Sequence, residues 1–226
     1  MAKSQVFKSI GRIFLLAFAL FILLSTLATL PLRWINPGLT AFTVRDDIDY
    51  SLRERWVGYS ELSPELLLAV IAAEDQKFPQ HFGLDVESIK KSLAETRGRR
   101  RGASTITQQL AKNLYLSPSR SLFRKGLEAW LSVCIEFFLP KTRILELYVN
   151  VIEFGPGVYG VNKASGDFFL VSATGLDRWQ ASFLAAVLPN PKQMSVTTPS
   201  HYVSSRAASI RRSMSALGGI AYLQAL

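Results

Sequence analysis

Two short stretches of the sequence carry most of the residues that could do chemistry. The first runs from Glu74 to Asp85 and holds three acids and one histidine within twelve residues. The second runs from Gly102 to Asn113 and contains two adjacent glutamines and a lysine. A carboxylate can act as a general base, amides can hold sugar hydroxyl groups, and a cation can stabilise an anionic leaving group. The two stretches together therefore suit the transfer of a sugar from an anionic leaving group to a hydroxyl acceptor.

Helical geometry places the polar residues of the second stretch on one face. At about 100° per residue, Gln108, Gln109 and Lys112 share one side of a helix predicted over 104–115. The opposite side is apolar and consists of Ile106, Leu110 and Leu114. The helix is therefore expected to pack on its apolar side and to present its amides and its cation to a site.

The next predicted long helix, over 121–139, has a similar polar row. Arg124, Lys125 and Glu128 lie close together on it at helical spacing. Taken alone, an Arg–Glu pair at i, i+4 is typical of an ordinary solvated helix surface and contributes little to stability. The alternative interpretation is that these residues form a second cationic row at a site, because their helix directly follows the amide-rich helix.

Glu74 is the candidate general base. It is predicted near the end of a helix over 63–76 and follows the apolar run 69–72. Partial burial would raise the pKa of its carboxyl group toward a value useful for a base, whereas a solvated surface acid is the alternative. His81 is expected to be a hydrogen-bonded structural histidine.

The N-terminal region has the features of a membrane anchor. Residues 13–32 contain no charge, and twenty helical residues at about 1.5 Å each span a hydrocarbon core of about 30 Å. Lys3, Lys8 and Arg12 precede the run, so the positive-inside rule predicts a cytoplasmic N-terminus. A cleaved signal peptide is the alternative, but its apolar region is usually shorter. We expect the anchor to contribute localisation and effective concentration at the membrane, and no active-site groups.

The sequence predicts four regions and a mainly α fold. The regions are a cytoplasmic tail (1–12), a transmembrane anchor (13–32), a connector (33–60) and a catalytic domain (61–226). Besides the helices already named, helices are predicted over 85–95, 141–150, 161–170, 177–188 and 200–217. Ser104 is the expected N-cap of the amide-rich helix, and the arginine-rich run 97–102 is expected to be a mobile loop. Alternating β patterns are scarce.

The chain is basic, with 26 Lys and Arg against 17 Asp and Glu and a net charge of +9. A basic domain beside a bilayer has anionic partners in phospholipid head groups and lipid diphosphates. Nucleic acid is the usual first interpretation of such a charge, but the anchor moves the domain out of the cytoplasm, and we expect no nucleic-acid partner. The single cysteine, Cys134, follows apolar neighbours and is expected in the core.

Three further segments complete a recognisable pattern: 124–128 (RKGLE), 141–150 (KTRILELYVN) and 154–160 (FGPGVYG). Together with the first two stretches, they resemble the motifs of the peptidoglycan glycosyltransferases, glycosyltransferase family 51, over about residues 60 to 215. The resemblance implies a lysozyme-like α fold with a membrane-proximal lobe. It also implies a monofunctional enzyme that polymerises lipid II, a disaccharide-peptide on undecaprenyl diphosphate, with inversion and release of undecaprenyl diphosphate.

The resemblance assigns roles to individual residues. Glu74 would be the base and Glu128 a second catalytic carboxylate. The one candidate cofactor is a divalent ion (Mg²⁺ or Mn²⁺) held by these two acids. The substrate-binding residues would be Ser104, Gln108, Gln109, Lys112, Asn113, Arg120 and Lys125. Expected partners are lipid II, the growing glycan strand, membrane lipids and cell-wall synthesis or division proteins. The expected location is the bacterial inner membrane, with one membrane pass and an extracytoplasmic catalytic domain.

Two segments depart from the family pattern. The run 178–181 (RWQA) lacks the acid that usually precedes the alanines, and the C-terminal motif around Arg206 and 211–212 is loosely matched. Both departures concern details of the acceptor side. Two other patterns are coincidental: the glycines at 155, 157 and 160 follow a predicted helix and not a strand, and Ser88-x-x-Lys91 lacks the partner motifs of penicillin-binding domains.

Two alternative functions are weaker. A lysozyme-like hydrolase releases no diphosphate, so the cations at 112, 120, 124 and 125 would have no role. An inactive wall-binding or scaffold protein would be expected to show damage in the polar motifs, and none is visible.

Overall fold

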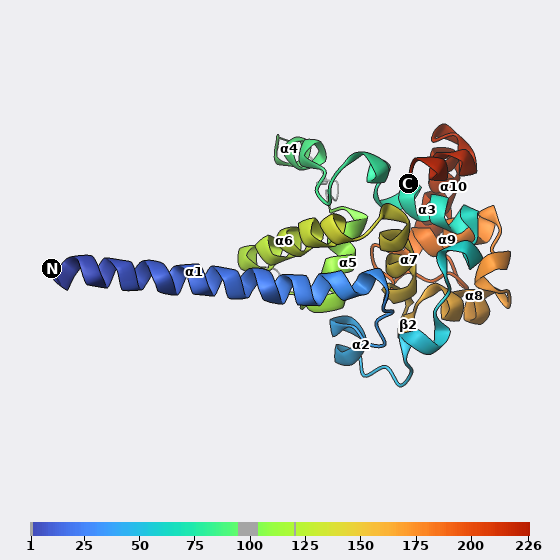
Figure 1. Cartoon of the computed structure of the whole chain (residues 1–226). Coiled ribbons are helices and arrows are strands. Elements are labelled where there is room, and N and C mark those ends of the chain that lie inside the picture. Colours follow the sequence, from blue (N-terminus) through green and yellow to red (C-terminus); the bar gives the residue numbers. More distant parts are fainter. Residues whose placement is uncertain (1, 95–103, 120) are drawn as a thin grey trace.

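The computed structural model describes residues 2–94, 104–119 and 121–226. The fold is mainly α, as predicted, with a long N-terminal helix, α1 (Ala2–Thr29), that projects from a compact helical body (Figure 1). The C-terminus lies in that body beside α10 (His201–Ala216), far from the free end of α1. The predicted mobile loop 97–102 lies outside the described residues.

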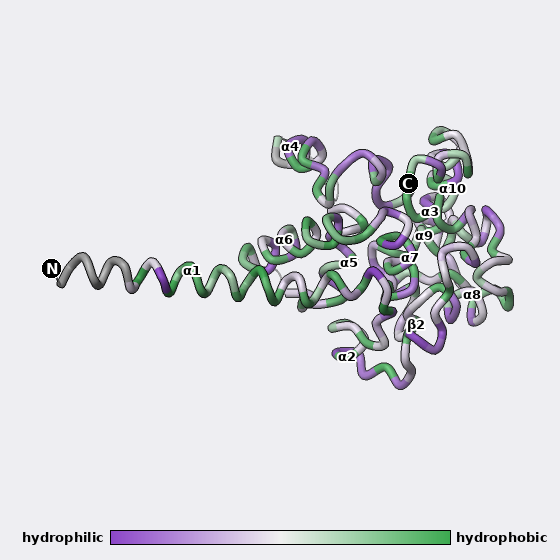
Figure 2. The backbone as a smooth tube through the Cα atoms, viewed as in Figure 1, coloured by the Kyte–Doolittle hydropathy of each residue, from purple (hydrophilic) through white to green (hydrophobic). Residues whose placement is uncertain are grey.

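Helix α1 is long and apolar enough to cross a membrane. Its span from Ser9 to Arg33, including a terminal 3-10 turn at Leu30–Arg33, has a mean hydropathy of 2.6 in its most apolar window. Most apolar side chains along it are exposed. Figure 2 colours much of the backbone of α1 as a nearly continuous hydrophobic stretch. These features are compatible with a single-pass membrane anchor.

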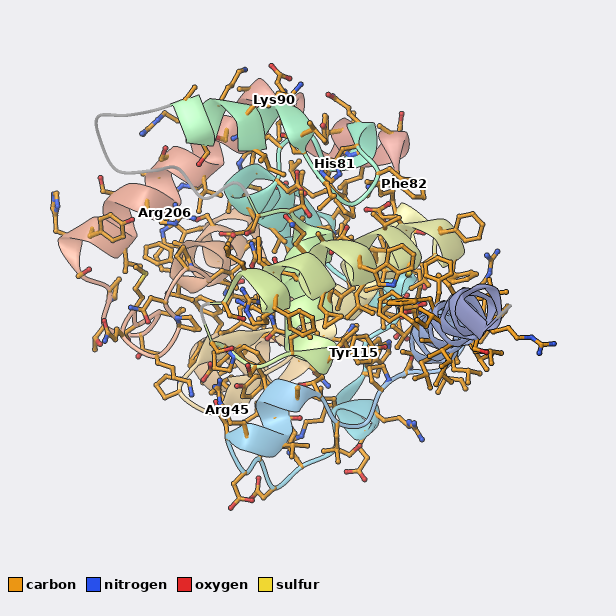
Figure 3. All side chains as sticks on the ribbon, turned by 90° about the vertical axis from the view of Figure 1, so that its left-hand side faces the viewer. Arg45, His81, Phe82, Lys90, Tyr115 and Arg206 are labelled. Atoms are coloured by element: carbon orange, nitrogen blue, oxygen red, sulfur yellow. The ribbon has the colours of Figure 1, made fainter. Side chains whose placement is uncertain are left out.

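The last turns of α1 are part of the packed domain, so the anchor also contributes tertiary contacts that the sequence did not indicate. Trp130 donates its indole N–H to the Ser25 hydroxyl at 2.9 Å, and the Tyr115 hydroxyl donates to the Ala28 carbonyl at 2.6 Å. Leu32 is buried with the core of the domain. Helix α6 (Leu122–Phe138) runs beside the C-terminal half of α1 (Figure 1). Tyr115 is labelled in Figure 3.

This packing predicts a stability difference between two truncations. Deleting 1–33 removes the partners of Tyr115 and Trp130, whereas deleting 1–12 removes only the predicted tail. At about 1 kcal/mol per lost hydrogen bond, together with the lost contacts of Leu32, we expect the longer deletion to lower the Tm by roughly 5 °C or more. Thermal unfolding of both variants in the same detergent, followed by circular dichroism, measures this. Equal Tm values would show that the contacts contribute nothing.

Helix α3 (Pro64–Glu74) is the central helix of the body. Its residues 66–72 are apolar and all buried, as is typical of a helix surrounded by other elements. Pro64 occupies the first turn, where its missing N–H costs nothing. The helix packs against α9 (Arg178–Val187) and α10. This packing holds Glu74, its last residue, at a fixed position inside the molecule.

A second group of helices faces this one. Helix α5 (Ile106–Tyr115) packs against α6 and α7 (Lys141–Val151). Thr105, and not Ser104, is the N-cap of α5: its hydroxyl accepts the Gln108 N–H at 3.1 Å, and the Gln108 side chain accepts the Thr105 N–H at 3.0 Å. This reciprocal capping box corrects the prediction and leaves the Ser104 hydroxyl available to another partner.

The remaining elements follow the predicted order. Helices α4 (Val86–Ala94) and α8 (Val161–Phe169) lie close to their predicted bounds. The connector is more regular than expected, because it contains α2 (Ala41–Arg45) and two 3-10 turns. Besides Leu30–Arg33, the 3-10 segments are Leu52–Arg55, Tyr59–Glu61, Phe78–Gln80, Ala173–Gly175 and Gly219–Ala225. Cys134 is only half-buried, so its predicted place in the core is not fully met.

A small antiparallel hairpin contains the glycine-rich segment. Strand β1 (Glu153–Gly155) pairs with β2 (Val158–Tyr159). Gly160 has φ = +81°, and a Cβ there would lie 2.8 Å from the Asn150 carbonyl oxygen, so only glycine fits this close approach. The glycines therefore form a tight turn beside α7, which excludes the dinucleotide-binding interpretation.

Candidate active site

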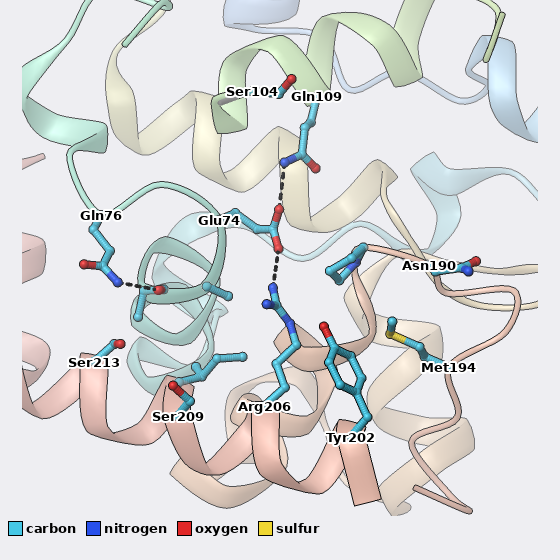
Figure 4. Close-up of a pocket in the computed structure, with 14 residues that line it drawn as sticks. Glu74, Gln76, Ser104, Gln109, Asn190, Met194, Tyr202, Arg206, Ser209 and Ser213 are labelled. Atoms are coloured by element: carbon cyan, nitrogen blue, oxygen red, sulfur yellow. Dashed lines mark hydrogen bonds and ion pairs between the residues drawn. The ribbon is translucent and has the colours of Figure 1, made fainter. Parts of the chain in front are cut away.

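Three connected hollows meet at Gln109 and Pro189, which line all of them. The largest, about 960 Å³, lies between the end of α3 and helix α10 (Figure 4). The second, about 260 Å³, runs along α6 to Glu128. The third, about 330 Å³, extends toward α2. Together they form a branched cleft of the size that holds an oligosaccharide-sized ligand.

Glu74 projects from the end of α3 into this cleft, with its side chain only 11% exposed. Its Oε2 accepts a hydrogen bond from the Gln109 amide at 2.8 Å, and its Oε1 accepts one from the Arg206 guanidinium at 3.2 Å (Figure 4). It lines both the largest hollow and the hollow along α6. A substrate in either branch could therefore reach this carboxylate.

Burial raises the pKa of Glu74 above its ordinary value of 4.5. The hydrogen bond from Gln109 and the charge of Arg206 oppose that rise, whereas the neighbouring charge of Asp75 adds to it. A carboxyl group with a raised pKa accepts a proton more readily than a solvated one, which suits a general base.

A cationic cluster lies at the other end of the second hollow. The buried carboxylate of Glu128 accepts from the Arg124 guanidinium at 2.6 Å and also pairs with the Lys125 ammonium group. Lys125 donates in addition to the Ser104 hydroxyl at 3.0 Å. Glu128 thus holds Arg124 and Lys125 in place at the wall of the hollow, where their remaining N–H groups can meet an anion.

Lys112 joins the cluster from α5. It lines the second and third hollows, and burial lowers the pKa of its ammonium group. The charge of Glu128 opposes this shift, and those of Arg124 and Lys125 add to it. An anionic ligand between these cations would stabilise all of their charges.

The structure brings together most of the predicted site residues. Around the second hollow lie Glu74, Ser104, Gln109, Lys112, Lys125 and Glu128. Gln108 is not in this group, because its buried side chain caps α5. Asn113 lines the third hollow, and its amide donates to the Gln109 carbonyl at 2.8 Å. Arg120 lies outside the described residues.

Arg206 was missed as a site residue by the sequence analysis, which placed it only in a loosely matched motif. It belongs to α10, whose buried positions include Val203, Ala207 and Ile210. Arg206 therefore flanks the packed face and reaches across to Glu74, 132 positions earlier (Figure 4). Its place in that loosely matched motif was the one signal in the sequence.

The first departure from the family pattern, the run 178–181, lines none of the three hollows. Gln180 forms a capping box with Asp177 at the start of α9, so an amide does the capping that an acid could do there. The Arg211 guanidinium donates to the Ser182 hydroxyl at 2.7 Å and thereby links α9 to α10. Both residues serve local structure.

His81 has the structural role predicted for it. Its Nε2 lies 3.0 Å from both carboxylate oxygens of Asp75, and the Ile106 N–H donates to one of them at 3.1 Å. Asp75 therefore joins the end of α3 to the start of α5. This contact sets the position of α5 relative to the neighbouring Glu74.

The two acids considered for a divalent ion, Glu74 and Glu128, are already paired with donors. Both oxygens of Glu128 accept from cations, and those of Glu74 accept from Gln109 and Arg206. Within the described ranges, no group of three or more His, Cys, Asp or Glu side chains is placed to hold a metal ion. A divalent ion here would have to displace a cation or lie beside one, so the residues as arranged do not fit it.

Comparisons with known proteins agree with this geometry. The transglycosylase family model matches residues 43–215, which is most of the chain. A biosynthetic peptidoglycan transglycosylase of Pseudomonas fluorescens (strain Pf-5) is 48% identical over 215 residues, which cover 91% of this chain and 90% of the relative. Another of the same name, from Stutzerimonas stutzeri (strain A1501), is 49% identical over 90% of this chain and 88% of its own. The chain therefore belongs to the transglycosylase family of glycosyl-transferring enzymes.

Proposed function

We propose that this enzyme builds peptidoglycan by polymerising lipid II, a disaccharide-peptide carried on undecaprenyl diphosphate. The observation that carries the proposal is the second hollow, which has a buried carboxylate, Glu74, at one end and paired cations at the other. The names of the similar proteins from Pseudomonas and Stutzerimonas support the same reaction. The expected products are a longer glycan strand and free undecaprenyl diphosphate.

The reaction needs one proton acceptor and one stabilised leaving group. Glu74 would take the proton from a sugar hydroxyl of the acceptor while that oxygen attacks the anomeric carbon of the donor. The bond from that carbon to the diphosphate oxygen breaks at the same time, and its electron pair leaves with the diphosphate. Attack opposite the leaving group inverts the anomeric centre.

The cations would stabilise the departing diphosphate. Lys112, Arg124 and Lys125 all line the hollow that contains Glu74. Because Glu128 holds Arg124 and Lys125 before any ligand arrives, little reorganisation is needed as negative charge develops. Glu128 is therefore proposed to act by fixing these cations.

The proposed location is the bacterial inner membrane, with α1 as a single-pass anchor and the cleft on the extracytoplasmic side. The three basic residues before the apolar span support a cytoplasmic N-terminus. In this arrangement the enzyme meets lipid-linked substrate, the growing glycan strand and membrane lipids. Proteins of cell-wall synthesis and division are further proposed partners.

An assay of the full chain in detergent tests the proposal. With lipid II as the only sugar substrate, we expect glycan polymer that a moenomycin-like phosphoglycolipid abolishes, because this inhibitor carries sugars, a phosphate and a lipid. A fluorescent penicillin should not label the protein, since Ser88 on α4 bonds to Asp85 and lacks the partner motifs of a penicillin-binding serine. Release of short fragments from added glycan, without polymer from lipid II, would instead indicate a hydrolase.

A further inference from the structure

The side-chain amide that contacts Glu74 is itself hydrogen-bonded to a buried tyrosine. The hydroxyl of Tyr148, on α7, donates to Oε1 of Gln109 at 2.9 Å, and the Nε2 group of the same amide donates to Glu74. Tyr148 is fully buried and lines none of the three hollows. We propose that Tyr148 is a positioning residue: it orients the Gln109 amide so that its donor end faces Glu74 and favours the ionised carboxylate. The inference rests on the proposed role of Glu74 as the base.

The argument begins with the asymmetry of a carboxamide. One branch is an oxygen that only accepts and the other is an NH₂ group that only donates. If Tyr148 donates to the oxygen, the NH₂ group must point the other way, toward Glu74. Were the amide turned over, its oxygen would face the carboxylate, and two acceptors would oppose each other in a buried place, which is costly.

The state that follows proton transfer shows why this orientation matters. A protonated Glu74 becomes a donor, and its best partner would be the oxygen of Gln109. That oxygen already accepts from Tyr148, so turning the amide over would leave the buried phenol without its acceptor. Tyr148 therefore favours the amide orientation that suits the ionised carboxylate.

Tyr148 is suited to stay a neutral donor. Burial raises the pKa of its hydroxyl well above the ordinary value, and the negative charges of Glu74 and Asp75 add to the shift. The proton therefore remains on the phenol across the pH range in which a carboxylate base works. A phenylalanine at this position would keep the ring and remove only the donor.

Several charged groups act on Glu74 besides this amide. Asp75 follows α3, Lys112 lies on α5 and Arg206 lies on α10. Helix α6 contributes Arg124, Lys125 and Glu128. Arg206 contacts the other oxygen of the carboxylate, so it can hold the charge but cannot orient the amide. Since the Tyr148→Phe substitution leaves all of these charges in place, it isolates the effect of the orientation.

The test measures the protonation of Glu74 directly. In the full chain in detergent, ¹³C NMR of labelled glutamate carboxyl groups follows the titration, and Glu74→Gln identifies the resonance. We expect Tyr148→Phe to raise the pKa of Glu74 by about one unit, the size expected for one hydrogen bond to a charged group. Because the base works when ionised, the acid limb of the rate profile should move to higher pH by the same amount. A role in packing alone would lower the rate equally at every pH.

Two further variants make the result decisive. Tyr159→Phe removes a hydroxyl from another buried tyrosine, which donates to Asp46 away from Glu74, and it should leave the titration of Glu74 unchanged. Gln109→Ala removes the amide, and adding Tyr148→Phe to it should then change the pKa of Glu74 no further. Additive shifts, or no shift in either single variant, would overturn the inference. The NMR titration needs no turnover, so its outcome is separate from that of the polymerisation assay.

Discussion

The Glu74→Gln variant is expected to lose glycan polymerisation by a factor of about 10² to 10⁴, the usual contribution of a general base. The amide has the size of the carboxylate but cannot accept the proton of the acceptor hydroxyl. Donor binding should persist, because the cationic cluster of Lys112, Arg124 and Lys125 remains. The rate of polymer formation from lipid II, measured beside binding of a phosphoglycolipid, separates the two effects.

A matched control for this substitution is Glu87→Gln. Glu87 lies on α4, is exposed and pairs with Lys77 and Lys91 outside the cleft. It should retain nearly full activity, since exposed ion pairs contribute little. Wild-type turnover in Glu74→Gln would contradict the assignment of the base.

In the unchanged enzyme, the raised pKa of Glu74 predicts that activity falls as pH drops through a value above 4.5, because the protonated carboxyl group can no longer act as a base.

The Lys112→Ala variant is expected to lower kcat by about 10² to 10³, the cost of removing one donor that stabilises charge in a transition state. Lys112 is half-buried, and the charges of Glu128, Arg124 and Lys125 act on it. Its charge acts mainly when the diphosphate departs, so kcat and kcat/KM should fall together. Steady-state rates of polymerisation over a range of lipid II concentrations measure both.

Lys163→Ala is the matched control. Lys163 lies on α8, pairs with Asp167 at 2.8 Å and lines none of the three hollows. Its removal takes away the same charge without touching the proposed site. If Lys112→Ala stayed within twofold of the wild-type rate, or if both variants lost activity alike, the proposed role of the cation cluster would be refuted.

The helices could be predicted from the sequence because their signals are local. Pro64 and Pro140 mark helix starts, and the apolar side of α5 repeats at helical spacing. Capping, proline geometry and amphipathic spacing act within a few residues of each other, so they can be recognised without the rest of the fold. The same holds for the residue types of the motifs, which indicated a carboxylate base and a cationic row.

The choice between Gln108 and Gln109 depends on both local and tertiary contacts. The two lie about 100° apart on a helix, so both fall within its polar face. The Thr105-x-x-Gln108 spacing fits a local capping box, which turns Gln108 back onto the N-terminus of α5. Only the tertiary packing points Gln109 at Glu74 and brings the Ser104 hydroxyl to Lys125.

The sequence by itself determined the helical class, the apolar N-terminal span and the chemistry of the candidate site. The tertiary structure decided which distant groups meet: Arg206 with Glu74, 132 positions apart, and Tyr148 with Gln109, 39 positions apart. It also decided that the end of α1 packs against Tyr115 and the indole of α6. The physical reason is that such contacts depend on how whole helices pack around one core, and that packing is the sum of many weak apolar contacts that no short stretch of sequence contains.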